Sequence, residues 1–326
     1  MFPAPNTKCG VDVPTGVPAC AEGDACEAPA VRARNDAREA VCAILVTFRP
    51  PPEVLMNIRQ VREQVQSLIV VDNGSGRSSV AMLRGTSAEQ RFLLIENKDN
   101  LGIAAALNIG IKEAAIQGYR WVILFDQDSR ATPGFIDKMF AGMRVLPDGD
   151  KVAIFCPRYI DRASGRPMPS TTLADGSLAV ARSSGSLMPM WVFERCGWFI
   201  EEMVIDQVDY EYCLRVRSFG YRIIECEAVL LHTLGKPKVH RLLGRRLFAT
   251  TNHSAARRYY LVRNRVWLSR KHLMSNPRWC LEAGFATLKE CAKIALVEDY
   301  RWSKLRYTFL GVRDGLIGRM GKTVEL

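Results

Sequence analysis

The chain has 326 residues, of which 48% are hydrophobic and 24% charged, so it is long enough for a full hydrophobic core and has a globular composition. No apolar run reaches the roughly 18–20 residues that cross a membrane, and the first residues lack the basic and apolar regions of a secretory signal. The formal net charge of +11 is uneven, because residues 232–326 hold 20 Lys and Arg against 6 Asp and Glu. This basic C-terminal third predicts an anionic partner, such as a phosphate, a nucleic acid or an acidic membrane surface.

The first residues and the cysteines point to a cytoplasmic chain with a polar leader. Residues 1–38 are rich in Pro, Ala, Gly and charge and show no hydrophobic periodicity, which predicts a disordered leader outside the fold. The ten cysteines form no C-x-x-C pair and show no zinc-finger spacing. A reducing cytosol is the simplest setting for such cysteines.

Residues 40–125 alternate short apolar runs with segments of helical spacing. The runs are short and lack the alternation of a half-exposed strand, so they predict strands buried on both faces. These strands are expected at 40–48, 68–71, 92–95 and 121–125, with helices at 54–65 and from about 103 to 117. This order predicts βαβ units, and therefore an α/β fold with a mostly parallel central sheet and helices on both faces. The glycines match neither the dinucleotide fingerprint nor the phosphate loop, which argues against a dehydrogenase or a nucleoside triphosphatase.

Polar residues follow the ends of three of these strands. They are Asp72, Asn97, Asn100, Asp126 and Asp128. Because right-handed crossovers bring the carboxyl ends of parallel strands to one edge, we expect these residues to converge where open α/β sheets bind ligands. Two carboxylates one residue apart, together with a phosphate, suit Mg²⁺ or Mn²⁺. The alternative is that Asp126 and Asp128 only cap the helix that begins near Pro133.

A second group of acids lies further along the chain. Asp206, Asp209 and Glu211 stand at the start of a predicted helix and offer a candidate general base. The alternative is that they are N-terminal helix charges, with Glu211 paired to Arg215. A lone histidine such as His232 is more often structural than a ligand.

The C-terminal region, residues 241–326, is predicted to be helical and basic. Apolar positions recur among its Lys and Arg residues, so its helices could pack on the preceding domain or lie on an anionic membrane. Its charge also fits a nucleic-acid-binding module without catalysis, although it contains no recognisable nucleic-acid motif. The expected organisation is thus a leader at 1–38, an α/β domain at 39–240 and a basic helical region at 241–326.

Together these residues resemble the family 2 inverting glycosyltransferases, which have the GT-A fold, over about residues 40–235. The resemblance implies that Asp128, with Asp126 and His232, holds a divalent cation. The implied contacts with a nucleotide-sugar are Thr47, Phe48, Asp72, Asn73, Asn97, Asn100, Gly102, Asn108, Asp126 and Gln127. Arg258 and Arg263 are expected to add positive charge against the diphosphate.

The resemblance also implies the general base. Asp209 matches the family's catalytic aspartate, with Glu211 beside it, and Asp206 is the alternative base one turn earlier. The chain departs from the family pattern at this point, because Val208 stands in place of Glu and Glu211 in place of a second Asp.

Four segments narrow the resemblance to bacterial rhamnosyltransferases, including those that add the second rhamnose in rhamnolipid synthesis. They are FDQDS, IDQVDYEYCLR, His232 with Gly235, and RRYYLVRN. The resemblance implies metal-dependent, inverting transfer of L-rhamnose from dTDP-L-rhamnose to a glycolipid, converting a mono-rhamnolipid to a di-rhamnolipid. The alternative acceptor is a lipid-linked O-antigen or polysaccharide precursor. Either acceptor implies a cytoplasmic enzyme peripheral on the inner face of the inner membrane, with no nucleic-acid partner.

Overall fold

The structure is a computed structural model that describes residues 41–144, 151–233, 238–242, 245–250 and 252–325. The predicted leader at 1–38 lies outside the described residues, and so does Gly235.

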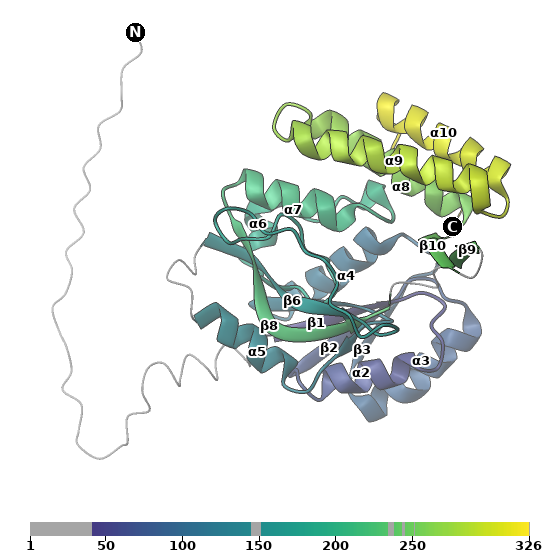
Figure 1. The fold of residues 1–326 in the computed structure, drawn as a ribbon. Coiled ribbons are helices and arrows are strands. Elements are labelled where there is room, and N and C mark those ends of the chain that lie inside the picture. The colour runs from purple at the N-terminus through teal and green to yellow at the C-terminus, as the bar shows by residue number, and fades with distance from the viewer. Residues whose placement is uncertain (1–40, 145–150, 234–237, 243–244, 251, 326) are drawn as a thin grey trace, which may run out of the picture.

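A central eight-stranded sheet organises the described part of the chain (Figure 1). Its strands, in spatial order, are β3 (Leu93–Glu96), β2 (Ser67–Asp72), β1 (Val41–Thr47), β4 (Trp121–Asp126), β7 (Leu187–Pro189), β6 (Val152–Asp161), β8 (Arg222–His232) and β5 (Arg130–Ala131). The first four strands of this order are mutually parallel, as β6 and β8 are, whereas β7 and β5 are antiparallel to their neighbours. The mostly parallel sheet predicted from the sequence is therefore confirmed.

The central strands are buried on both faces, as their unbroken apolar runs predict. Along β1, Ile44 and Val46 belong to one hydrophobic core, while Ala43 and Leu45 belong to the other. The whole of β1 is buried, with exposed fractions of 0–5% for its apolar side chains. Because successive side chains of a strand point to opposite faces, one strand serves two cores.

Helices cover both faces of the sheet. The helices α4 (Ile103–Ile116), α6 (Trp191–Cys196) and α7 (Val208–Ser218) contribute to the first core. The helices α2 (Val54–Arg62), α3 (Arg77–Gln90) and α5 (Phe135–Arg144) lie on the other face (Figure 1). No helix is predicted from the sequence at the residues of α3, which buries a single side chain, Leu83.

The region after β8 differs in part from the helical expectation for residues 241–326. An antiparallel hairpin of β9 (Lys238–Leu242) and β10 (Arg245–Thr250) replaces the helix expected from residue 241 onward. Pairing between two strands is a tertiary interaction, which the charged composition of this segment does not reveal. The remainder is helical as predicted, with α8 (Ala255–His272), α9 (Pro277–Val297) and α10 (Arg301–Ile317).

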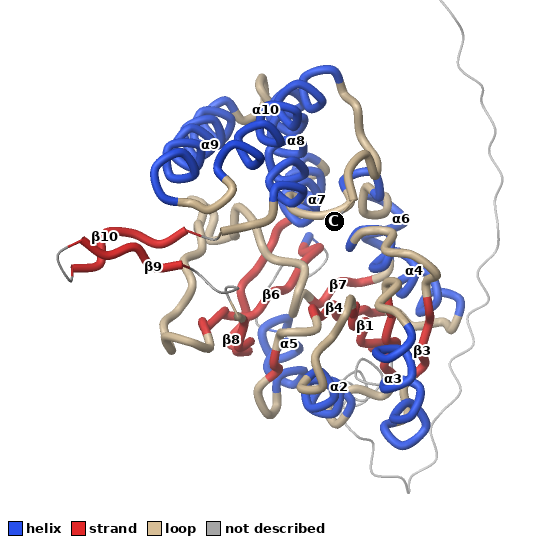
Figure 2. The backbone as a smooth tube through the Cα atoms, turned by 90° about the vertical axis from the view of Figure 1, so that its right-hand side faces the viewer, coloured by secondary structure: helices blue, strands red, loops and turns tan. Residues whose placement is uncertain are grey.

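The three C-terminal helices pack over the α7 side of the sheet (Figure 2). In α8, the Arg263 guanidinium donates to the backbone oxygens of Glu202 and Met203, and the Asn264 amide donates to those of Met203, Ile205 and Asp206. Two side chains of α8 therefore hold the loop that leads into α7. Within the described residues, no helix is both long and apolar enough to span a bilayer.

Candidate active site

The carboxyl ends of β1, β2 and β4 bring the predicted residues to one edge of the sheet. Thr47 pairs in register with Asp72, and Val46 pairs with Asp126. The strand order reverses between β1 and β4, which is where open α/β sheets bind ligands. The convergence predicted from strand ends is therefore present.

Asp126, Asp128 and His232 form a cluster at this edge whose ligand atoms all lie within 4.8 Å of one another. Asp126 is the last residue of β4, Asp128 lies on the loop after it, and His232 is the last residue of β8. The first N–H of α5, from Phe135, donates to Gln64 Oε1 at 2.7 Å, so a side chain other than Asp126 or Asp128 occupies this N–H. Two carboxylates and an imidazole are a suitable donor set for Mn²⁺ or Mg²⁺.

Two serine hydroxyls connect the three parts of this cluster. The Asp126 N–H donates to Ser184 Oγ at 3.0 Å, and the Ser184 hydroxyl donates to Ser129 Oγ at 2.8 Å. Ser129 Oγ in turn lies 3.0 Å from Nδ1 of His232. Because this contact occupies Nδ1, it orients the ring so that Nε2 remains for a cation.

Gln127 fixes the loop that bears the two aspartates. Its side-chain oxygen accepts from the Phe48 N–H at 2.8 Å, and its side-chain amide donates to the Phe48 carbonyl at 3.2 Å. The Asn57 amide of α2 donates to the Gln127 backbone carbonyl at 2.8 Å. The loops after β1 and β4 are thus joined, and Gln127 positions its neighbours.

The electrostatics of the cluster suit a bound cation. Burial, together with the negative charges of Asp128 and Asp209, raises the pKa of Asp126 to about 7 against the opposing charges of Arg182 and Arg257. Burial lowers the pKa of His232, against the effect of Asp128, and so favours the neutral ring that metals bind. Crowded carboxylates beside a neutral imidazole are stabilised when a divalent cation neutralises them.

The structure distinguishes the two candidate bases. Asp206 forms a two-bond ion pair with Arg257, with both N–O distances 3.0 Å. Asp209 instead lies, together with Arg182, on the lining of a small hollow. Burial raises the pKa of Asp209 to about 6, although the Tyr210 N–H and Arg182 lower it. Among the described residues, Asp209 is therefore the one of the two candidate bases that makes no ion pair.

Glu211, expected beside the catalytic base, has a different place. It is 1% exposed and forms a two-bond ion pair with Arg215, at 2.7 and 3.0 Å. Arg215 also donates to the Cys196 carbonyl at 2.7 Å. The carboxylate faces the interior between α6 and α7, so the expectation of a catalytic Glu211 is corrected to a structural role. The i,i+4 pair that the sequence offered as the alternative is confirmed.

A polar groove opens beside the cluster, at the ends of β1, β2 and β3. It encloses about 490 Å³, open solvent included. It is lined by Phe48, Arg49, Gly74, Lys98, Asp99 and Asn100, and from the far end of the chain by Lys322 and Glu325. Phe48 and Asn100, both expected to contact a nucleotide, thus lie at one hollow.

Thr47, Asp72 and Asn73 lie beneath this groove, with exposed fractions of 0–3%. Asp72 accepts from the Thr47 hydroxyl at 3.0 Å and from the Ser75 N–H at 3.0 Å. These side chains are engaged inside the protein, which corrects the expectation that they reach a ligand directly. They shape the floor of the groove by holding the loops after β1 and β2.

An amide network continues this floor towards β3. The Asn97 amide donates to Asn73 Oδ1 at 3.1 Å, and the Asn73 amide donates to Asn100 Oδ1 at 2.9 Å. The Asn100 oxygen also accepts from the Gly102 N–H at 2.9 Å. Asn97 and Asn100 are only partly buried, and Asn100 also lines the groove.

Gly102 and Asn108 serve packing rather than ligand contact. Gly102 has φ +90°, and a Cβ there would lie 2.6 Å from the Val204 carbonyl oxygen, so only glycine fits. Asn108 is 1% exposed, and its side chain exchanges hydrogen bonds of 2.9 and 3.1 Å with the Phe199 backbone. The expectation that both touch a nucleotide is therefore corrected, because they join α4 to the loops before α7.

The arginines predicted for the diphosphate are also corrected. Arg258 is 3% exposed and pairs with Glu290 and Glu298, at 3.0 and 3.1 Å. Arg263 is 0% exposed, and its donors are directed to backbone oxygens and Asn264. Both arginines hold the C-terminal helices together.

Two other arginines face the acidic cluster, and sequence reasoning missed them. Positive charge from Arg182 and Arg257 lowers the pKa of Asp126. Within the described part of the chain, the Arg182 guanidinium makes no ion pair and lies over the Tyr159 ring, 5.3 Å from its centroid. Arg257 and Arg258 are neighbours in the same basic segment of the sequence. Neighbouring residues of a helix point in different directions, and composition does not tell which of the two arginines points towards the site.

The fold and this edge of the sheet define a glycosyltransferase of the GT-A fold. The sequence profile described as Glycosyl transferase family 2 matches residues 42–189. The chain is 32% identical over 298 residues to dTDP-rhamnosyl transferase RfbF of Shigella flexneri, covering 86% of this chain and 97% of that protein. The chain therefore belongs to glycosyl transferase family 2, and the alternative of a nucleic-acid-binding module without catalysis is set aside.

Solved structures share the fold. One is the mannosyltransferase PcManGT from Pyrobaculum calidifontis in complex with GDP-Man and Mn²⁺, with a TM-score of 0.53 and 16% identity, covering 86% of this chain and 88% of that one. Another is S. aureus TarS 1-349, with a TM-score of 0.54 and 12% identity, covering 84% of this chain and 81% of that one. At these identities the similarity shows the fold alone.

Proposed function

We propose that this chain transfers L-rhamnose from dTDP-L-rhamnose to a hydroxyl of a lipid-borne sugar, with inversion at the anomeric carbon. The observation that carries the proposal is the Asp126–Asp128–His232 cluster with Asp209 beside it, at the edge of the sheet where nucleotides bind. Similarity over nearly the whole length of a dTDP-rhamnosyl transferase supports the donor. The rhamnolipid acceptor expected from the sequence is not among the activities named for these relatives, so the acceptor is proposed only as a lipid-borne sugar.

The nucleotide is proposed to lie in the polar groove, with its base against Phe48 and its diphosphate directed towards Asp128. Phe48 offers a ring for stacking, and Arg49 already lies over it at 4.8 Å. Asp128, Asp126 and His232 would hold Mg²⁺ or Mn²⁺, which when bound neutralises charge on the departing diphosphate. The Mn²⁺ named with the Pyrobaculum mannosyltransferase supports this assignment. Arg182 adds positive charge on the same side.

Asp209 is proposed as the general base. It takes the proton of the acceptor hydroxyl as that oxygen bonds to the anomeric carbon and the bond to the diphosphate breaks. Direct displacement needs one base and no covalent intermediate, so a β-linked donor gives an α-rhamnoside. Asp206 pairs with Arg257, whose positive charge acts on Asp126, and we assign Asp206 a supporting role.

Purified protein with dTDP-L-rhamnose, a divalent cation and a panel of acceptors tests the proposal by mass spectrometry. The panel includes a mono-rhamnolipid and a lipid-linked saccharide, since these are the two acceptors that the sequence suggests. Addition of one deoxyhexose to either one supports the proposal. Transfer from another nucleotide-sugar, with none from dTDP-L-rhamnose, would contradict the donor assignment.

The pH dependence of turnover follows from the Asp209 pKa. Burial raises this pKa to about 6, with Asp206 raising it and Arg182 lowering it. Only the ionised carboxylate of Asp209 can accept a proton. We therefore expect kcat to level off above about pH 7 and, below pH 6, to decrease by a factor that approaches ten for each pH unit. Steady-state rates at saturating donor and fixed Mg²⁺ measure the profile, with dTDP affinity followed over the same range. A flat kcat between pH 5 and 8 would contradict Asp209 as the base.

The proposed acceptor is lipidic, and two apolar stripes on the C-terminal helices support contact with a membrane surface. Exposed apolar side chains recur at helical spacing on the outer side of both helices. They are Leu281, Phe285, Leu288 and Leu296 of α9, and Trp302, Phe309 and Leu316 of α10, with exposed fractions of 52–77%. Exposed cations lie beside these stripes, including Arg278 and Lys289 of α9 and Arg306 of α10. Apolar stripes flanked by cations are typical of helices that lie on anionic lipid.

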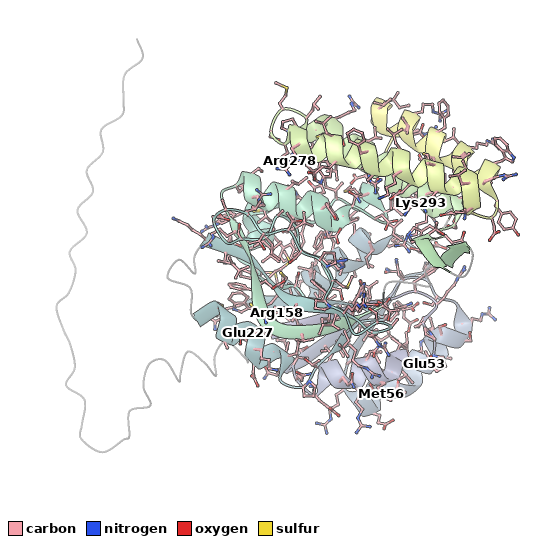
Figure 3. All side chains as sticks on the ribbon, viewed as in Figure 1. Glu53, Met56, Arg158, Glu227, Arg278 and Lys293 are labelled. Atoms are coloured by element: carbon pink, nitrogen blue, oxygen red, sulfur yellow. The ribbon has the colours of Figure 1, made fainter. Side chains whose placement is uncertain are left out.

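The double variant Phe285→Glu with Phe309→Glu replaces the central aromatic residue of each stripe. It is expected to lower partition onto anionic vesicles by about tenfold or more, because two rings that would insert into the lipid are lost. Co-sedimentation with phosphatidylglycerol vesicles measures this. Met56→Glu is the matched control, since Met56 is 56% exposed on α2, at the other end of the molecule from Arg278 and Lys293 of α9 (Figure 3). Equal partition of the double variant and wild type would remove the membrane contact from the proposal.

A further inference from the structure

The segment that follows α10, residues 318–325, folds back onto the protein at defined points. The Gly321 N–H donates to the Glu202 carbonyl at 2.9 Å, and its carbonyl accepts from Arg263 at 2.6 Å. The Thr323 hydroxyl donates to the Tyr259 hydroxyl at 2.7 Å, and the Val324 N–H donates to the Tyr260 hydroxyl at 3.0 Å. These contacts, made by α8 and by the loop before α7, fix where the segment lies.

This segment ends at the polar groove. Lys322 and Glu325 line the same hollow as Phe48, Lys98 and Asn100. The groove therefore has one wall from the loops after β1, β2 and β3, and a second wall from more than two hundred residues further along the chain. No motif in the sequence links the two walls.

The second wall carries a charge that a nucleotide can use. Lys322 Nζ pairs with Glu325 Oε2 at 3.1 Å, and the two side chains are 34% and 89% exposed. An ion pair this exposed contributes little free energy, so an anionic ligand can replace Glu325 as the partner of Lys322. Arg49 and Lys98 also line the groove, so three cations and two carboxylates, Asp99 and Glu325, surround a space of nucleotide size.

We propose that residues 318–325 form the outer wall of the donor site and that Lys322 binds the diphosphate of the nucleotide. This inference rests on the proposed function, since it places the nucleotide in this groove. A nucleoside diphosphate has at least two negative charges. The ammonium group of a lysine is a point charge on a flexible side chain, so it can pair with the diphosphate in more than one orientation. Lys322 is thus a donor-binding residue supplied by the C-terminal region.

The anchoring of the segment explains how a distant part of the chain can serve the site. The same Arg263 guanidinium donates to Gly321 on the second wall and to Glu202 and Met203 in the loop before α7. The wall and the loop that leads to Asp209 are therefore held at a fixed separation. A nucleotide in the groove and a base on α7 share this common support.

Titration of dTDP into purified protein by calorimetry tests the inference. Lys322→Ala is expected to raise the dissociation constant about fivefold to tenfold, which is the loss of one charge-assisted contact. Lys322→Arg is expected to bind within about twofold of wild type, because it keeps the charge. Lys138→Ala, which removes an exposed lysine from α5, is the matched control and should leave the binding unchanged.

Thymidine has no phosphates, so its binding does not depend on a charge contact with Lys322. Comparing the affinities for thymidine and dTDP therefore distinguishes the loss of this contact from a general distortion of the groove. Lys322→Ala is expected to leave thymidine affinity unchanged, whereas an equal loss for thymidine and dTDP would overturn the role in diphosphate binding. A Lys322→Ala protein that binds dTDP as tightly as wild type would also overturn the inference while leaving the proposed function standing. Failure of the wild type to bind dTDP would instead overturn the proposed function.

Discussion

Asp209→Asn is expected to lower kcat by about 10²–10⁴-fold and to leave the dissociation constant for dTDP within about twofold of wild type. The amide matches the carboxylate in size, and its oxygen can still accept from the Tyr210 N–H, which now lies 3.0 Å from Asp209 Oδ1. It cannot take a proton from the acceptor hydroxyl. Steady-state kinetics with saturating acceptor and calorimetric titration with dTDP measure the two quantities separately.

Asp206→Asn is the matched comparison for this variant. Asp206 is three residues away and bears the same group, but it is held by Arg257 at 3.0 Å. Its replacement weakens that ion pair without removing the base, so we expect a smaller loss of kcat than in Asp209→Asn. If Asp206→Asn were the inactive variant and Asp209→Asn kept nearly full activity, the two assignments would be reversed.

Asp128→Asn is expected to lower kcat by about 10²-fold or more at ordinary metal concentrations, because a cation that stabilises the leaving group is worth several kcal/mol. The substitution removes one carboxylate from the cluster of Asp126, Asp128 and His232. Because the Asp128 charge helps to raise the pKa of Asp126, that pKa should fall towards its ordinary value. Titration of activity with Mg²⁺ and Mn²⁺ should show a higher half-saturating concentration for both ions.

Glu282→Gln controls for the loss of any surface carboxylate, since Glu282 is 63% exposed and pairs only with Arg278 one helical turn before it among the described residues. It is expected to leave the metal titration unchanged. Wild-type protein that remains fully active after exhaustive treatment with a chelator would contradict the metal assignment. The proposed positive charge of Arg182 would then have to stabilise the leaving group alone.

The sequence carries much of this architecture because the signals are local. The runs at 40–48 and 121–125 have no polar positions facing solvent, which happens only where helices cover both faces of a sheet. β1 and β4 are such strands, and every apolar side chain in β1 is at most 5% exposed. Once their parallel pairing is expected, the meeting of Asp126 with the ends of β1 and β2 follows from chain geometry.

What the sequence could not give depends on contacts between distant segments. Arg182 and Arg257 differ from a solvent-exposed arginine only in what the fold places opposite them. Arg258 and Arg263 match the expected charge, but carboxylates and carbonyls from other helices already engage them. Asn108 fits the family segment, yet its partner is the Phe199 backbone, ninety-one residues away. Residue type and spacing identify a candidate site residue, but the packing of the fold decides whether its side chain can contact a ligand.

The Arg263 and Asn264 contacts make the basic helices part of one cooperative folding unit with the catalytic domain. Removal of α8 would take the Arg263 donor from the Glu202 carbonyl and the Arg263 and Asn264 donors from the Met203 carbonyl, in a region where Met203 is 0% exposed. The loop before α7 would then lose the side-chain hydrogen bonds that α8 gives to its backbone. A protein shortened before residue 255 would consequently lose more than its lipid-facing stripes, and exchanging these helices between relatives would succeed only if the loop at 202–206 were exchanged with them.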